Sequence, residues 1–110
     1  MDANLVNYKR DWTLVGSQTG HNNIALPSIY KELHVKVCDT ATGVSFVFNI
    51  LKEDMPSSGS ISFRSGYSYQ SGTYYAMCAV GTDATNIWVD DIRINTSQPL
   101  STTAIEVYYK

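Results

Sequence analysis

Charged residues, and basic ones above all, are scarce in this chain. Its 110 residues include 8 Lys and Arg against 10 Asp and Glu, so the charged share is 16% and the formal net charge is −2 at pH 7. Nucleic-acid-binding domains need a basic surface that displaces counterions from phosphates, and this composition argues against one. Low charge instead favours surfaces that contact another protein or a sugar.

Long apolar runs are also absent. No segment approaches the roughly 20 apolar residues of a membrane span, and residues 1–10 lack the apolar core of a signal peptide. We therefore expect that the chain is synthesised in the cytoplasm and does not insert into a membrane. The length fits one domain, which we place at residues 11–110, after an N-terminal arm at residues 1–10.

Cysteine and histidine are too few for most catalytic arrangements, since the chain has two of each. The nucleophile elbow, the phosphate-binding loop, the dinucleotide fingerprint and the zinc-protease motif are all missing. We therefore predict no enzymatic activity and no cofactor. In the cytosol Cys38 and Cys78 should be thiols that pack as small hydrophobic residues; a disulfide between them is the alternative.

Two candidate metal sites fail on geometry. His34 and Cys38 fall on one face of a predicted strand, but four strand residues separate their Cα atoms by roughly 13 Å, too far for one tetrahedral zinc ion. Asp90 and Asp91 are adjacent, so they point to opposite faces and reach one calcium ion only if a bulge redirects one of them. We expect these carboxylates to mark a bulge and predict no metal.

What the chain does have is an alternation of apolar and polar side chains with a period of two residues. Strands that are buried on one face need this period. Clusters of Gly, Ser, Asn, Asp and Pro interrupt it every 8–12 residues or so, which is typical of sandwiches and jelly rolls. The sequence therefore predicts an all-β fold, a single antiparallel β-sandwich of about eight strands that is jelly-roll-like.

The predicted strands cover residues 12–15, 24–26, 32–38, 44–51, 61–64, 74–80, 87–94 and 103–109. Polar loops are expected at 16–23, 52–60 and 65–72, the last as a loop or a broken strand, and recognition would lie in these loops. One helical turn at 28–31 is an alternative that the spacing of Ile29 and Leu33 allows. The expected core consists of Trp12, Leu14, Leu26, Leu33, Val35, Val37, Phe46, Phe48, Ile50, Ile61, Phe63, Met77, Ile87, Ile105 and Val107.

Aromatic side chains supply the candidate binding residues. Tyr67, Tyr69, Tyr74, Tyr75, Trp88 and Tyr108 are interleaved with Ser, Gly, Gln, Asn and Asp. Of these, we take Tyr67, Tyr69, Tyr74 and Trp88 as the candidate binding residues. Flat rings beside short hydrogen-bonding side chains suit both sugars and protein interfaces. Tyrosine is also enriched in strands, so packing or a subunit contact is the alternative role for these rings.

Several short motifs resemble small β-sandwich domains of phage tail structural proteins. They are Trp12 before Gly16-Ser-Gln-Thr-Gly20, then Ile24-Ala-Leu-Pro27, Tyr30-Lys-Glu-Leu-His-Val-Lys-Val37, Gly72-Thr-Tyr-Tyr75 and the closing Val107-Tyr-Tyr-Lys110. The resemblance covers most of the chain. It implies a β-sandwich at the host-facing tip of a tail fibre or receptor-binding protein, often trimeric, and it transfers no catalytic or receptor-binding residue.

These observations lead to one main function and two alternatives. We expect a non-enzymatic virion protein domain from a phage or prophage, located in the phage tail, that forms a homo-oligomer, contacts other virion proteins and attaches to a host-surface glycan or protein. Oligomer formation would explain the low charge and would cover sheet edges. The alternatives are a carbohydrate-binding or lectin-like domain and an interaction domain of a larger bacterial surface protein.

Overall fold

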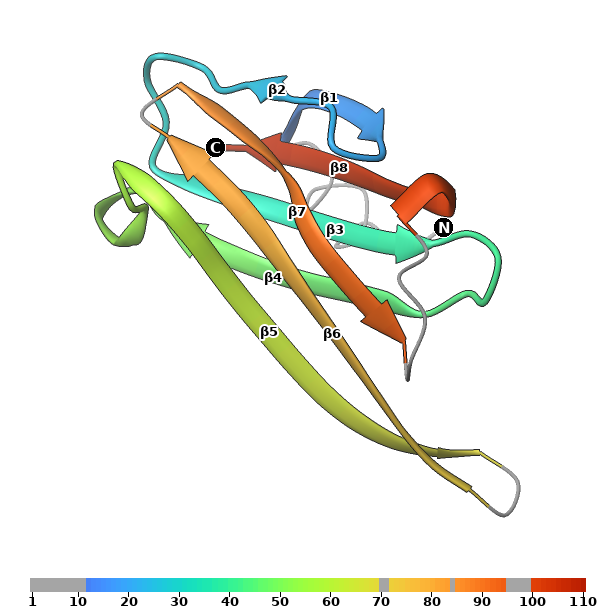
Figure 1. Cartoon of the computed structure of the whole chain (residues 1–110). Coiled ribbons are helices and arrows are strands. Elements are labelled where there is room, and N and C mark those ends of the chain that lie inside the picture. The colour runs from blue at the N-terminus through green and yellow to red at the C-terminus, as the bar shows by residue number, and fades with distance from the viewer. Residues whose placement is uncertain (1–11, 70–71, 84, 95–99) are drawn as a thin grey trace, which may run out of the picture.

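A β-sandwich is the architecture of the computed structural model, which describes residues 12–69, 72–83, 85–94 and 100–110 (Figure 1). Across these residues, eight strands form two antiparallel sheets of four. Sheet A contains, in spatial order, β1 (Thr13–Thr19), β8 (Thr103–Tyr109), β3 (Glu32–Asp39) and β4 (Ser45–Leu51). Sheet B contains β2 (Ile24–Ala25), β7 (Asn86–Ile94), β6 (Gly72–Asp83) and β5 (Ser58–Tyr69). The predicted all-β sandwich is confirmed.

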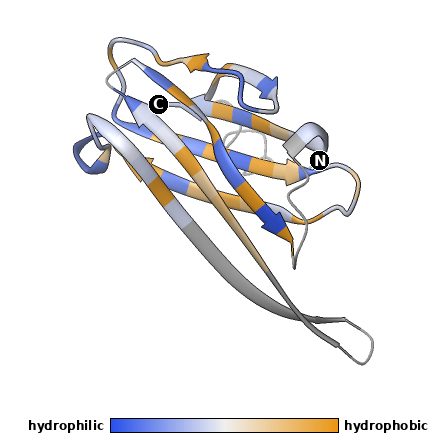
Figure 2. Ribbon diagram, viewed as in Figure 1, coloured by the Kyte–Doolittle hydropathy of each residue, from blue (hydrophilic) through white to orange (hydrophobic). Residues whose placement is uncertain are grey.

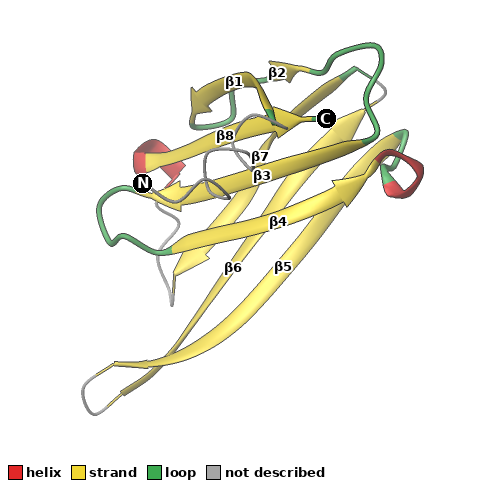
Figure 3. Cartoon of the chain, turned by 180° about the vertical axis from the view of Figure 1, so that it is seen from behind, coloured by secondary structure: helices red, strands yellow, loops and turns green. Residues whose placement is uncertain are grey.

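The connections alternate between crossings and hairpins. The chain passes from one sheet to the other between β1 and β2, β2 and β3, β4 and β5, and β7 and β8, whereas β3–β4 and β5–β6–β7 are hairpins within one sheet. Short 3-10 turns, η1 (Lys52–Asp54) and η2 (Leu100–Thr102), precede β5 and β8. Figure 3 shows the sandwich from the side of sheet A.

The core lies between the two sheets and follows the predicted alternation, which Figure 2 shows as bands along β3 and β7. Leu33, Val35 and Val37 of β3 are fully buried, and so are Ile105 and Val107 of β8. Sheet B contributes five fully buried residues, of which only Ile87 was in the predicted core: Cys78, Val80, Ile87, Val89 and Ile92.

Leu26, Phe48 and Ile61 are half-buried and pack against the core as predicted, but three other predicted core residues lie outside it. Leu14 is 56% exposed, because a register shift between Leu14 and Gly16 turns it to the outer face of sheet A. Trp12 and Met77 are only half-buried; Ala76 and Cys78, on either side of Met77, point inward instead. The Phe63 side chain lies outside the described residues, as does the predicted N-terminal arm at 1–10.

The predicted bulge at Asp90 and Asp91 is confirmed. Ala79 pairs with Asp91 and the next residue, Val80, pairs with Val89, so Asp90 is the extra residue on β7. An extra residue shifts the phase of the strand by one. As a result Ile87 and Val89 before the bulge, and Ile92 and Ile94 after it, all face the core.

Part of the predicted loop at 16–23 is a strand, and at 65–72, where the prediction was a loop or a broken strand, the backbone is a strand as far as Tyr69. Residues 16–19 continue β1 because they pair with β8 as far as Thr19 and Ala104. Residues 65–69 continue β5, paired with β6 as far as Tyr69 and Gly72, and β6 itself runs on to Asp83. Backbone pairing with a neighbour has overridden the turn propensity of Gly and Ser in these segments. The alternative helical turn at 28–31 is not present.

Candidate functional site

The four predicted binding residues all lie on sheet B, but the backbone brings only three of them together. Tyr67 is directly opposite Tyr74, and Tyr69 is opposite Gly72, near the far end of the β5–β6 hairpin. Their side chains lie outside the described residues. Trp88 is in β7, opposite Gly81 and several residue pairs away from the tyrosines.

Trp88 packs across the outer face of sheet B. Its neighbours Ile87 and Val89 are fully buried and point inward, so the half-buried indole points outward. The indole occupies the space over Gly81: a Cβ atom added to Gly81 would lie 2.3 Å from the indole nitrogen. This contact gives Trp88 a packing partner of its own within the sheet.

The β5–β6 hairpin extends beyond the other strands. β7 pairs with β6 only along residues 76–82, so residues 66–69 and 72–75 pair with each other and with no third strand that the structure describes. Figures 1 and 3 both show this part of the hairpin projecting from the sandwich. Its residues therefore lie in a two-stranded ribbon.

β5 is also an edge strand, since it comes last in sheet B among the strands of residues 12–69, 72–83, 85–94 and 100–110. It is 12 residues long. Between Met55 and Thr82 the sequence has a single charged residue, Arg64. Edge strands present unpaired N–H and C=O groups, and soluble proteins usually protect them with charge, proline or shortness. The long edge of β5 has little of this protection.

A second feature is a group of rings on the outer face of sheet A, here named the aromatic platform: Trp12, His34 and Tyr108. The His34 ring centroid lies 5.5 Å from that of Trp12 and 6.1 Å from that of Tyr108, with the ring planes tilted by 50° and 55°. His34 and Tyr108 are cross-strand neighbours on β3 and β8. All three side chains are half-buried.

Hydrogen bonds orient the platform. With its Nδ1 protonated, His34 donates to the amide oxygen of Asn49 on β4 (2.6 Å). The Tyr108 hydroxyl donates to the carboxylate of Glu106 (2.9 Å). This hydrogen bond, together with partial burial and the charge of Glu106, raises the pKa of Tyr108. The Lys110 ammonium lies 4.7 Å from the centre of the Trp12 ring, a cation–π distance.

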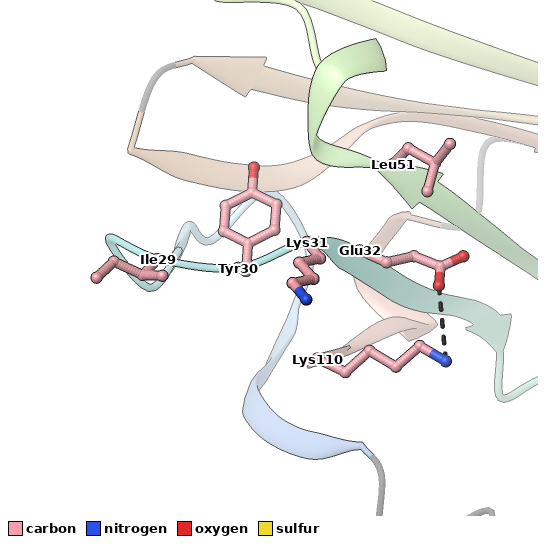
Figure 4. A pocket seen from close by; sticks show the side chains of 6 residues that line it. All are labelled: Ile29, Tyr30, Lys31, Glu32, Leu51 and Lys110. Atoms are coloured by element: carbon pink, nitrogen blue, oxygen red, sulfur yellow. Dashed lines mark ion pairs between the residues drawn. The ribbon is translucent and has the colours of Figure 1, made fainter.

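Two hollows adjoin the platform. A groove of about 620 Å³ lies at one end of sheet A, lined by Ile29, Tyr30, Lys31, Glu32, Leu51 and Lys110 (Figure 4). Lys110 joins it to the platform, because its ammonium is also 3.9 Å from Glu32. A smaller hollow of about 390 Å³ lies along β1 and β8, lined by Ser17, Gln18, Thr19, Ala104 and Glu106.

Sequence reasoning missed the platform as a unit. His34 and Tyr108 both fall on the polar phase of their strands. Their proximity depends on how β3 pairs with β8, and these strands lie more than 60 residues apart in the chain. Trp12, which was predicted to lie in the core, is the third member.

The cysteines form no site. Both are free thiols, Cys38 half-buried in sheet A and Cys78 buried in sheet B, so the alternative disulfide is not formed. Burial raises the pKa of Cys78 to about 12. Within the described ranges, no group of three or more His, Cys, Asp or Glu side chains gathers to hold a metal ion, and no helix is long and apolar enough to cross a membrane.

No protein-family model, curated protein or solved structure matches the chain.

Proposed function

We propose that this chain is a non-enzymatic structural domain of a phage or prophage virion, of the tail fibre or receptor-binding type, which assembles with copies of itself and takes part in host attachment. The observation that supports assembly best is the long, open and almost uncharged edge of β5. The resemblance of the sequence motifs to phage tail domains supports the class of particle.

The hairpin needs a partner on physical grounds. A two-stranded hairpin is marginally stable in water by itself, yet residues 66–69 and 72–75 form one beyond the edge of β7. A strand or sheet face from another molecule would pair with the open backbone of β5 and cover the ribbon. The partner would convert a marginal element into a stable one.

A second copy of the chain is the partner that fits best. Most soluble oligomers consist of identical chains in closed symmetry. Because the hairpin has only Arg64 as a charged residue between Met55 and Thr82, two or three copies can approach there with little electrostatic repulsion. A trimer is the arrangement that the resemblance implies.

Light scattering of the full chain at micromolar concentration tests the assembly. We expect an oligomer, and we expect Ser62→Lys to convert it into a monomer, because Ser62 is exposed on β5 and a lysine there opposes edge pairing. Ser101→Lys is the matched control, since Ser101 is an exposed serine in η2, away from β5. A wild-type monomer, or equal effects of both variants, would refute assembly through β5.

The virion assignment needs its own test. An antibody against the chain should label purified particles at the tail, and the neighbouring genes should encode tail and lysis proteins. Purified particles that lack the chain would contradict the assignment, whatever the oligomeric state.

The carbohydrate-binding alternative draws on the aromatic platform instead of the hairpin. A monomer that binds a saccharide and is absent from virions would favour a free carbohydrate-binding domain.

A further inference from the structure

We infer that the aromatic platform on sheet A is a binding site for a neutral saccharide. The inference deepens the proposed function and rests on it for its biological role, because such a site would contact a host-surface glycan. Its physical basis is separate, since the platform lies on sheet A and the proposed assembly surface on sheet B.

The rings are not part of the core. Along β3, Leu33, Val35 and Val37 are fully buried and point between the sheets. His34 and Lys36 alternate with them and so point outward. The platform therefore stands on the outer face of sheet A, where half-buried rings are not required to fill the interior.

Cross-strand pairing places polar groups around the rings. One row across the outer face consists of Leu14, Tyr108, His34 and Asn49, and the next consists of Ser17, Glu106, Lys36 and Val47. Tyr108 and His34 are thus central in their row. The amide of Asn49 lies at one end of this row, and the carboxylate of Glu106 and the ammonium of Lys36 lie in the neighbouring row.

This combination matches the chemistry of a sugar. The C–H faces of a pyranose pack against aromatic rings, and its hydroxyl groups need donors and acceptors at the ring edges. Because the oxygen of Asn49 accepts from His34, its NH₂ group offers donors to a ligand. Glu106 binds the Tyr108 hydroxyl through one oxygen and offers the other as an acceptor.

The charge pattern favours a neutral ligand. Lys36 is opposite Glu106 in the pairing of β3 with β8, and Lys110 lies 3.9 Å from Glu32. The two signs are therefore balanced across the face, which does not attract a strongly charged partner. A stable protein–protein interface would bury about 800 Å² of surface on this side. The large exposed apolar residues in the two rows, Leu14 and Val47, lie at opposite edges of the sheet and form no continuous apolar patch for such an interface.

The hollow along β1 and β8 gives the ligand a place beside the rings. Ala104 and Ser17 are small, and with Thr19 and Glu106 they line a space of about 390 Å³. Glu106 belongs to both the hollow and the platform. A saccharide unit stacked on Tyr108 can therefore extend into the hollow.

The two tryptophans make a direct test possible. In full-length chain labelled with 5-fluorotryptophan, Trp12 reports on the platform and Trp88 on the opposite sheet. The probes are glucose, galactose, mannose and N-acetylglucosamine, their β-linked oligomers, and glucuronic acid. We expect at least one neutral sugar to shift the fluorine resonance of Trp12 in a saturable way and to leave that of Trp88 in place.

Variants assign the shift to the platform. We expect Asn49→Ala to weaken the apparent affinity about fivefold, the effect of one lost hydrogen bond, and Tyr108→Ala to weaken it about tenfold or more. Asn23→Ala, at an exposed loop asparagine, should leave the affinity unchanged. Asn49 is exposed, so its replacement tests binding without threatening the fold.

Three results would overturn the inference: no shift with any sugar, equal shifts at both tryptophans, or a shift with glucuronic acid alone. A fourth is a Trp12 resonance that sugar shifts only in a variant without residues 1–10. The last would mean that the chain's own N-terminus covers the platform. A monomer in light scattering that shows a saturable Trp12 shift would refute the assembly proposal and support the saccharide site. An oligomer without a Trp12 shift would support assembly and refute the saccharide site.

Discussion

The carboxylate of Asp39 is fully buried at the end of β3, where it joins two distant parts of the chain. The Thr42 hydroxyl donates to it (2.6 Å), as do the backbone N–H groups of Thr42 (3.1 Å) and Ala41 (3.3 Å). The Thr102 hydroxyl in η2 donates to Oδ1, the oxygen that also accepts from Ala41, whereas both Thr42 donors bind Oδ2. A single side chain therefore links the β3–β4 turn to the segment before β8.

These contacts make stability depend on pH. Burial raises the pKa of Asp39, but the hydrogen bonds from Thr102, Thr42 and Ala41 favour the charged form more strongly, so the pKa is lowered overall. A lowered pKa in the folded state stabilises the fold above the unfolded-state pKa of about 3.9, and this stabilisation is lost as the pH falls through the folded-state pKa.

We therefore expect Asp39→Asn to reduce the free energy of unfolding by about 1–3 kcal/mol at neutral pH, because two hydroxyl donors and two backbone donors lose a charged acceptor. The difference from wild type should shrink as the pH falls below the unfolded-state pKa of about 3.9 and through the lower folded-state pKa of Asp39. Urea unfolding at a series of pH values measures it. Asp54→Asn, at an exposed site in η1, is the control; a difference that stays constant down to the lowest pH would contradict the prediction.

Trp88 shows how far a single residue can be predicted. Its neighbours Ile87 and Val89 are buried, so the two-residue period of a strand by itself places the indole on the opposite face, where it lies. The contact with Gly81 could not be predicted, because the pairing of β6 with β7 is set by the bulge between them. The face on which a side chain lies follows from the sequence of its own strand. A contact between strands also depends on the register in which the two strands pair.

At the scale of elements, the bulge at Asp90 determines which side of β7 is buried. The residues before it and after it occupy opposite phases in the sequence, yet both sets face the core. A shift of one residue in register exchanges the two faces of a strand. The extra residue therefore allows one strand to place both apolar sets inward.

Deletion of Asp90 should consequently unfold the chain. Without the extra residue, either Ile87 and Val89 or Ile92 and Ile94 must turn outward, and exposing two such side chains costs about 3–6 kcal/mol, a large part of the stability of a small domain. Circular dichroism during urea or thermal unfolding measures the loss. Asp90→Asn, which keeps the chain length at this exposed site, should change stability by less than about 0.5 kcal/mol; a deletion variant as stable as Asp90→Asn would show the bulge to be dispensable.

Elements with a strong alternation were predictable, and those rich in small polar residues were not. The predicted 32–38 and 103–109 segments match β3 and β8 closely. Residues 16–19 and 65–69 read as loops because Gly, Ser and Gln have little preference for strands, and they are extended here because β8 and β6 pair with them. The length of the β5–β6 hairpin is thus a property of pairing that composition conceals.

At the scale of the whole molecule, the candidate sites lie where the sequence could not point. Recognition was predicted in loops, yet the two features argued above are a sheet face and a sheet edge. The aromatic platform combines His34 of β3 with Trp12 and Tyr108 from the two ends of the described chain. The open edge of β5 follows from the order of strands in sheet B. Both features depend on the order and pairing of strands that are distant in the sequence, and local sequence patterns do not contain this information.

Amide hydrogen exchange separates the proposed assembly from a hairpin that is stable by itself. Among the strands that the structure describes, residues 66–69 and 72–75 pair only with each other, and an isolated two-stranded ribbon opens readily. We expect their exchange to be fast in dilute solution and slow where the chain is oligomeric, while exchange in the central strand β3 stays independent of concentration. Ser62→Lys should keep the hairpin in fast exchange at every concentration, and Ser101→Lys should behave as wild type. Slow exchange in a proven monomer would mean that the ribbon needs no partner, because opening is then limited by contacts within one chain.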